Sequence, residues 1–357
     1  MAHSPAADPT APRLDARLVP AALTGWMVTA VGIVWPIGTI VGSVCLAASA
    51  SGALLWRFGP RHPRIRAIGI GLAATGVVGA GFGFAIALRA DAVAHHPIAA
   101  AFGTTAEVAV TPTQSAVSVG HSQLLFRASL RQLAGKQTSG RAVVFASARD
   151  FGSVMVGRPM RFRARITAPT RRDLSVAVIT AVGAPTMGRA GPLNRAADAV
   201  RAGFAVAASR VLPADQAAML PALVLGDMSA VSTVTAQEFR TAGLTHLTAV
   251  SGANVTIVCG AVLFSSRLVG PRAAVGLAGI ALALFVIVVQ PSASVLRAAV
   301  MGAIALVGVL SSRRRQAIPA LAATVLLLMV IAPQLAVDVG LALSVVASLL
   351  WKPATTE

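Results

Sequence analysis

Two sets of polar residues in this sequence have types and positions that could do chemistry. The first set stands at or near the ends of apolar segments and comprises Asp227, His246, Ser251, Gly252, Asn254 and Arg297. Polar groups at membrane depth usually face protein or a watery cavity, so these side chains could contact a charged substrate during its passage. Gly252 would let chains approach closely or bend. Arg297, inside an otherwise apolar run, is the best candidate for a phosphate contact or for a buried pair with Asp227.

Ordinary structural roles would also explain these residues. Asp227 would cap a helix, His246 would be a hydrogen-bonded interfacial histidine, and Arg297 would extend its long side chain toward water. The residues alone leave the two interpretations equally open.

The second set lies on one predicted strand. Arg161, Arg163 and Arg165 alternate with apolar residues, which predicts a strand with one basic and one apolar face. Such a face could follow the phosphates of single-stranded nucleic acid. The alternative is a solvated strand face that binds nothing. Four phenylalanines could stack bases, although phenylalanine in a small barrel is usually core: Phe126, Phe145, Phe151 and Phe162.

The basic strand belongs to a segment that reads as a small β domain. Five runs rich in β-branched residues are predicted strands: 105–111, 122–130, 142–148, 159–168 and 174–182. Turn residues separate them, for example at 136–140. Five short strands in this length predict a small barrel of the OB type. Residues 194–211 then predict an amphipathic helix that lies on the membrane surface or packs against the spans.

The rest of the chain requires lipid as its solvent. Apolar residues make up 56%, mean hydropathy is +0.77, and only 12% of residues are charged, about half the usual share. The net charge of +18 is compatible with a polyanionic partner but does not identify one, because a GC-rich genome also enriches arginine. Eight apolar runs are predicted transmembrane helices: 20–35, 37–56, 67–88, 253–269, 273–290, 293–311, 317–332 and 336–351.

Loop charges give these spans one orientation. Arginines crowd the connection between the second and third spans and follow the fourth and sixth, whereas the turns at 35–36, 290–291 and 333–334 carry no basic residue. Positive residues stay on the cytoplasmic side. We therefore expect an inner-membrane protein with residues 1–19 as a cytoplasmic tail and residues 20–88 as three spans. The β domain, 89–190, would lie outside, followed by interfacial helices over 191–252 and a helix bundle over 253–351. The polar start lacks the pattern of a cleavable signal peptide.

Four short patterns in the second half carry a family resemblance. They are LxLGD at 223–227, FRxAGLxHLxAVSG at 239–252, SxxRAAxM at 294–301, and a weaker DxGxxLS at 338–344. In order and spacing they resemble the competence domain of ComEC-family channels, which import transforming DNA as a single strand. The resemblance covers roughly residues 20–350 and implies that single-stranded DNA and the lipid bilayer are the partners. Asn254 stands where many relatives carry histidine.

The resemblance also implies parts that this sequence does not contain. Full-length relatives continue through further spans, and many end in a metallo-β-lactamase-like domain. None of the histidines here forms an HxHxDH cluster, and no GxxxxGK[ST] loop is present, so we expect no enzymatic activity, metal or cofactor. A separate chain would supply the missing spans and nuclease, or the chain would self-associate. The alternatives are a non-functional remnant and a transporter for a small solute or lipid precursor.

Overall fold

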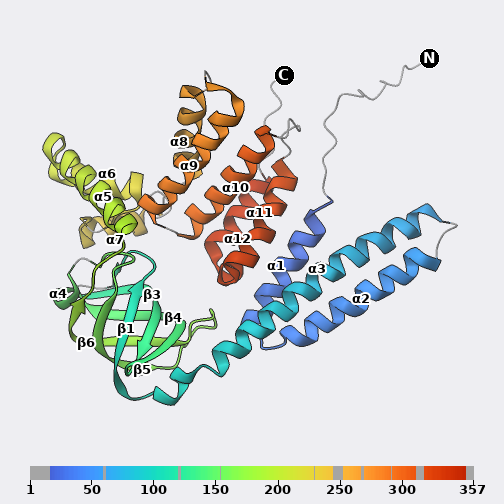
Figure 1. Cartoon of the computed structure of the whole chain (residues 1–357), viewed down its shortest axis with the longest axis horizontal. Coiled ribbons are helices and arrows are strands. Elements are labelled where there is room, and N and C mark those ends of the chain that lie inside the picture. Colours follow the sequence, from blue (N-terminus) through green and yellow to red (C-terminus); the bar gives the residue numbers. More distant parts are fainter. Residues whose placement is uncertain are drawn as a thin grey trace.

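The computed structural model describes residues 17–58, 62–119, 122–152, 154–228, 230–243, 252–266, 269–290, 292–310 and 317–350. It is mostly helical, with two groups of helices, and contains one closed β barrel that lies to one side of them (Figure 1). The helices of the first group are α1 (Val19–Val34), α2 (Gly38–Phe58) and α3 (Pro63–Ala94), continued by the 3-10 helix η1 (Pro97–Ala101). The others are α4 (Ala148–Phe151), α5 (Pro192–Val211), α6 (Ala214–Leu225), α7 (Thr233–Thr241), α8 (Gly252–Ser265), α9 (Pro271–Val289), α10 (Ala293–Leu310), α11 (Ala317–Ile331), η4 (Pro333–Val337) and α12 (Val339–Leu350).

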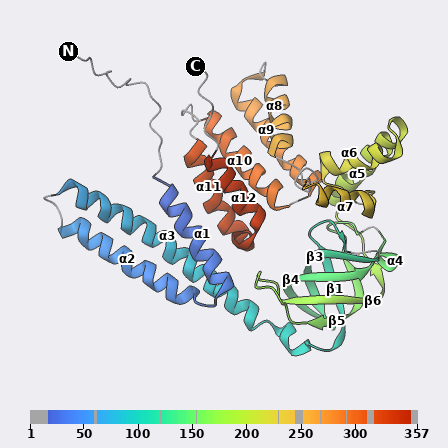
Figure 2. The same cartoon turned by 180° about the vertical axis from the view of Figure 1, so that it is seen from behind.

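Helices α2 and α3 form a hairpin that extends away from the barrel, as Figure 2 shows from behind. Small residues let their backbones touch. A Cβ built on Gly76 of α3 would lie 2.7 Å from the carbonyl oxygen of Cys45 and 2.7 Å from the amide nitrogen of Ser49, both in α2. A Cβ on Gly83 would lie 2.6 Å from the Cα of Gly42. No side chain larger than hydrogen fits at these two crossing points.

The barrel consists of five strands and one short extra strand. The strands are β1 (Thr105–Pro112), β2 (Val117–Val119), β3 (Gln123–Leu133), β4 (Lys136–Ser147), β5 (Met160–Thr167) and β6 (Ala177–Met187). The sheet order is β1-β5-β6-β4-β3-β2, and a further β1–β3 pairing closes it. β4 and β6 pair in parallel, whereas the other pairings are antiparallel. Alternate residues of each strand fill the barrel with an apolar core, because successive side chains point to opposite faces.

All five predicted strands are present, with two corrections. The predicted turn at 136–140 is wrong, because β4 already begins at Lys136 and the hairpin turns at Ala134 and Gly135. The short strand β2 was not predicted.

The second group of helices, α8 to α12, packs against the first. Leu321, Val325 and Leu328 of α11 share one buried cluster with Ala22 and Ile33 of α1. The indole nitrogen of Trp26 donates to the carbonyl of Ala336 in η4 at 2.9 Å. Helix α1 is therefore held to the end of α11 by apolar packing and one hydrogen bond.

Each of the eight predicted spans corresponds to a helix. Among the described residues, three helices are long and apolar enough to cross a membrane: Gly38–Phe58, Pro63–Ala101 and Pro271–Val289. Helices α1, α8, α10 and α11 are apolar but shorter. The protein is thus a membrane protein by composition, and the count of eight spans stays a prediction. Helix α3 extends well past the predicted end at 88, because helical hydrogen bonding continues after the apolar run stops.

Candidate functional site

The first and third sequence patterns adjoin where α6, α9 and α10 meet. Leu225, in the last turn of α6, shares a buried apolar cluster with Val289 and Val295. Gly226 follows with φ 70° and closes the helix, which is the usual role of glycine after a helix. Asp227 is partly buried, and its amide donates to the carbonyl of Pro221 at 3.2 Å. The LGD pattern therefore ends α6 next to the apolar cluster that α6 shares with the start of α10.

Asn254 connects the first pattern to the second. It lies in the first turn of α8, and its side-chain Nδ2 donates to the carbonyl of Leu223 at 3.3 Å. This bond satisfies a free carbonyl near the end of α6. Asn254 is thus a structural tie between α8 and α6, and its predicted place in the substrate path stays a prediction. Gly252 begins α8. His246 and Ser251 lie outside the described residues.

Arg297 and Asp338 connect the third pattern to the fourth. Arg297 is partly buried on α10, and the negative charge of Asp338 acts on it favourably. Asp338 also caps α12, because its Oδ1 accepts from the amide of Leu341 at 3.0 Å. Asp338 is thus an acidic residue whose charge acts on Arg297, and the predicted pair of Arg297 with Asp227 stays a prediction.

Hydrogen bonds at three places fasten the barrel to the ends of the helices. The hydroxyl of Ser115 in the barrel donates to Oε1 of Gln290, the residue that ends α9. Arg172, between β5 and β6, donates to the carbonyl of Val34 at the end of α1, at 2.7 Å. His96 Nε2 lies 3.0 Å from the carbonyl of Ser139, while its Nδ1 accepts from a backbone amide. The accepting Nδ1 places the ring proton on Nε2, which then donates to the barrel.

The basic strand has the predicted faces. Arg161, Arg163 and Arg165 are exposed on β5, and the residues between them are buried. The antiparallel register sets Glu107 beside Arg163, so one acidic residue lies within the basic row. No finding tests whether this face binds nucleic acid.

The four phenylalanines divide between the two faces of the barrel. Phe126, Phe151 and Phe162 are buried in the core, where the ring of Phe151 packs against the rings of the other two. Phe145 is half-buried, and because its neighbours in β4 are buried it points outward. It pairs with Thr180 of β6, which pairs in turn with Arg165. Of the four rings, Phe145 alone shares a face with the basic strand.

A second basic cluster lies at the junction of barrel and helices and was not predicted. It contains Arg89 near the end of α3, Arg127 of β3 and Arg141 of β4. Partial burial, together with the charges of Arg127 and Arg89, lowers the pKa of Arg141, and the nearby Asp173 opposes that shift. Asp173 lies 3.9 Å from Arg127. The outward alternation of Arg127 and Arg141 was visible in the sequence, but their meeting with Arg89 depends on the tertiary fold.

Comparison with known proteins gives one match. No curated protein and no solved structure matches the chain. Residues 223–351, which contain all four sequence patterns, match the family described as Competence protein, and this match confirms the resemblance of that part of the chain to the ComEC-type competence proteins.

Proposed function

We propose that this chain is a component of a membrane channel that imports single-stranded DNA. The observation that carries the proposal is the match of residues 223–351 to the competence family, within which the end of α6 packs on the start of α10 and Asp338 acts on Arg297. The barrel is fastened to the ends of α9 and α1. A strand guided by the barrel would therefore arrive beside Asp227, Arg297 and Asp338. The proposal assigns the chain no catalytic step.

The strand order of the barrel supports its assignment to the OB type. Without the short β2, the closed order is first, second, third, fifth and fourth, with the parallel contact between the third and fifth strands. OB barrels commonly bind single strands through a basic groove and aromatic stacking. Here Arg165 and Phe145 lie in one cross-strand row, where a phosphate and an adjacent base could be held together.

The loop charges support an orientation with the barrel outside the inner membrane and the amino terminus in the cytoplasm. The turn after α1 and the turn after α9 carry no basic residue, and both contact the barrel. The end of α2 and the start of α3, which carry arginines, lie at the far end of the hairpin (Figure 1). This division is what the positive-inside rule requires.

DNA binding tests the proposal most directly. The full chain in lipid nanodiscs would be titrated with a fluorescent single-stranded oligonucleotide at several salt concentrations. We expect log K to fall with log salt by about 0.7 per phosphate neutralised. Changing Arg161, Arg163 and Arg165 to glutamine should lower the slope by about 2.

A charge-matched control separates this site from general attraction. Changing Arg57, Arg64 and Arg66 to glutamine removes the same charge at the opposite end of the hairpin. That variant should keep the slope of the unmodified chain. Absence of binding at low salt, or equal losses in both variants, would contradict the proposal and favour a small-solute transporter or a remnant. A partner chain or self-association would complete the channel, and the mass of the complex purified from the native membrane would identify which.

A further inference from the structure

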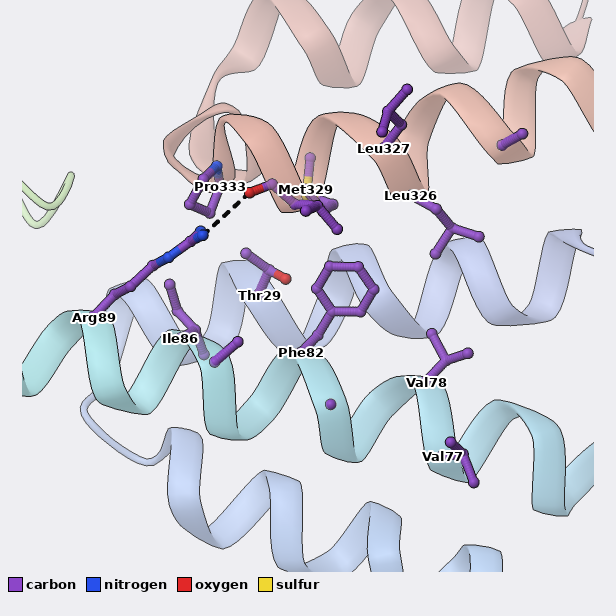
Figure 3. Close-up of a pocket in the computed structure, with 14 residues that line it drawn as sticks. Thr29, Val77, Val78, Phe82, Ile86, Arg89, Leu326, Leu327, Met329 and Pro333 are labelled. Atoms are coloured by element: carbon purple, nitrogen blue, oxygen red, sulfur yellow. Dashed lines mark hydrogen bonds between the residues drawn. The ribbon is translucent and has the colours of Figure 1, made fainter. Parts of the chain in front are cut away.

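Two adjoining cavities meet at Arg89, and they differ in chemistry. The first, about 630 Å³, is a groove between α1, α3 and α11. Its wall is almost wholly apolar, and Figure 3 shows Val78 and Phe82 of α3 extending toward Leu326 of α11. The hydroxyl of Thr29, one of its few polar groups, donates to the carbonyl of Gly25 within α1. The groove therefore offers a ligand apolar contact and little else.

The second cavity, about 660 Å³, is polar and lies between the helix ends and the barrel. Arg89 and Pro333 line both cavities, so the polar one continues directly from the apolar one. Arg141, His96, Thr138 and Gln334 also line it. Among the described residues, Oε1 of Gln334 is buried and lacks a hydrogen-bond partner. This acceptor suits a ligand that carries a hydroxyl or an amine.

The charges around the polar cavity favour an anion. The positive charge of Arg89 lowers the pKa of Arg141, so the two guanidinium groups repel one another. Asp173, the acidic residue close by, faces Arg127 and also accepts from the amide of Ser175. Among the described residues, Arg89 donates one hydrogen bond, at 3.2 Å, to the carbonyl of Val330, seen in Figure 3. A phosphate between the two guanidinium groups would offset their repulsion.

The height of Arg89 along α3 matches the edge of a bilayer. The apolar run of α3 from Ala67 to Leu88 is about 33 Å long at 1.5 Å per residue, close to the hydrocarbon thickness of about 30 Å. Arg89 follows this run directly. Val77, at the other end of the groove, lies about 18 Å along the helix from Arg89, roughly the depth of one leaflet. An apolar tail in the groove would thus place its headgroup at Arg89.

From these observations we propose that the two cavities form a binding site for an anionic glycerophospholipid. One acyl chain occupies the groove between α3 and α11, and the phosphodiester lies between Arg89 and Arg141. A hydroxyl of the headgroup donates to Gln334. The lipid would join the helices to the barrel at the membrane surface. This inference is independent of DNA transport, because neither the groove nor Arg89 belongs to the competence patterns.

Native mass spectrometry of the full chain in detergent tests the site with dioleoyl phosphatidylglycerol as the probe. Changing both Arg89 and Arg141 to glutamine should raise the apparent Kd about tenfold or more, the effect of one lost charge-assisted hydrogen bond. The control changes Arg64 and Arg131 to glutamine, two exposed arginines outside both cavities. This control should bind the lipid as the unmodified chain does.

A pair of glycine variants tests the groove. A Cβ on Gly81 or on Gly71 meets no atom within 4 Å, but only Gly81 lines the groove. Gly81→Leu should therefore weaken lipid binding, whereas Gly71→Leu should not. Equal binding by Gly81→Leu and Gly71→Leu would overturn the placement of the acyl chain.

Competitors distinguish the lipid from other phosphates. Millimolar inorganic phosphate should leave the lipid bound, because it lacks an acyl chain. If phosphate displaces the lipid, or if the Arg89 and Arg141 changes abolish oligonucleotide binding while lipid binding is kept, the cluster is a contact for a different phosphate and the proposal fails.

Discussion

Replacing Gly76 by alanine tests the close contact that shapes the α2–α3 hairpin. The added Cβ would lie 2.7 Å from two backbone atoms of α2, where ordinary contacts begin at 3.4 Å. Backbone atoms cannot rotate away, so the helices must separate by about 0.7 Å at this crossing. Overpacking of this kind costs about 1–3 kcal/mol. Transient opening of the hairpin should become correspondingly more frequent.

Thiol labelling measures that opening. Cys45 lies in this interface, since a Cβ on Gly79 would be 2.7 Å from its sulfur atom. In a Cys259→Ala background, the rate of maleimide labelling reports how often the interface opens. A cost of 1–3 kcal/mol corresponds to a rate about 5 to 150 times faster. Gly71→Ala is the control, because its Cβ would meet nothing within 4 Å. Equal labelling of Gly76→Ala and the unmodified chain would refute the contact.

Three further changes test contacts made by the helices. Arg297→Ala should lower DNA import while the amount of protein in the membrane stays the same. Adding Asp338→Ala should cause little further loss, because the two charges act on one another. Unchanged import in Arg297→Ala would remove Arg297 from the path. The buried Arg201 donates a 2.8 Å hydrogen bond to Asp198. Asp198→Asn should therefore lower the free energy of unfolding by about 1–3 kcal/mol in denaturant titrations. Adding Arg201→Met should restore the lost stability. Trp26→Phe removes a hydrogen bond between α1 and η4 and should cost about 1 kcal/mol, seen as a lower thermal midpoint; an unchanged midpoint would contradict that role.

The helices and the basic strand could be predicted because their signals are local. Apolar runs mark every helix of the two bundles, and the alternation around Arg163 gives the two faces of β5 correctly. The short helix α7 shows the limit of such reading. The residues Thr235 to Glu238 have the pattern of a capping box, but the hydroxyl of Ser232 accepts from the amide of Thr235 and the helix begins at Thr233. Two possible caps stood within one turn, and sequence alone did not rank them.

The β3–β4 hairpin was missed at its turn for a definable reason. A two-residue turn of this kind needs positive φ at both positions, a conformation that normally selects asparagine or glycine. Here Ala134 and Gly135 have φ of 49° and 80°. Alanine is rarely found in that conformation. The Gly and Ser residues after Lys136 therefore looked like the better turn, although they belong to β4.

The partner of Arg297 shows what helical geometry adds to a list of motifs. From the sequence we predicted Asp227 as its acidic partner, whereas in the structure the charge of Asp338 acts on Arg297. Val295 packs with Leu225 at the end of α6, which leads directly to Asp227. A side chain two residues further along a helix, as Arg297 is from Val295, points in a direction about 200° around the helix axis. Arg297 must then point away from α6 and toward α12, where Asp338 acts on it. The nearness of Asp338 to Arg297 follows from which face of α10 covers α6, and that face is set by packing and cannot be read from the spacing of the motifs.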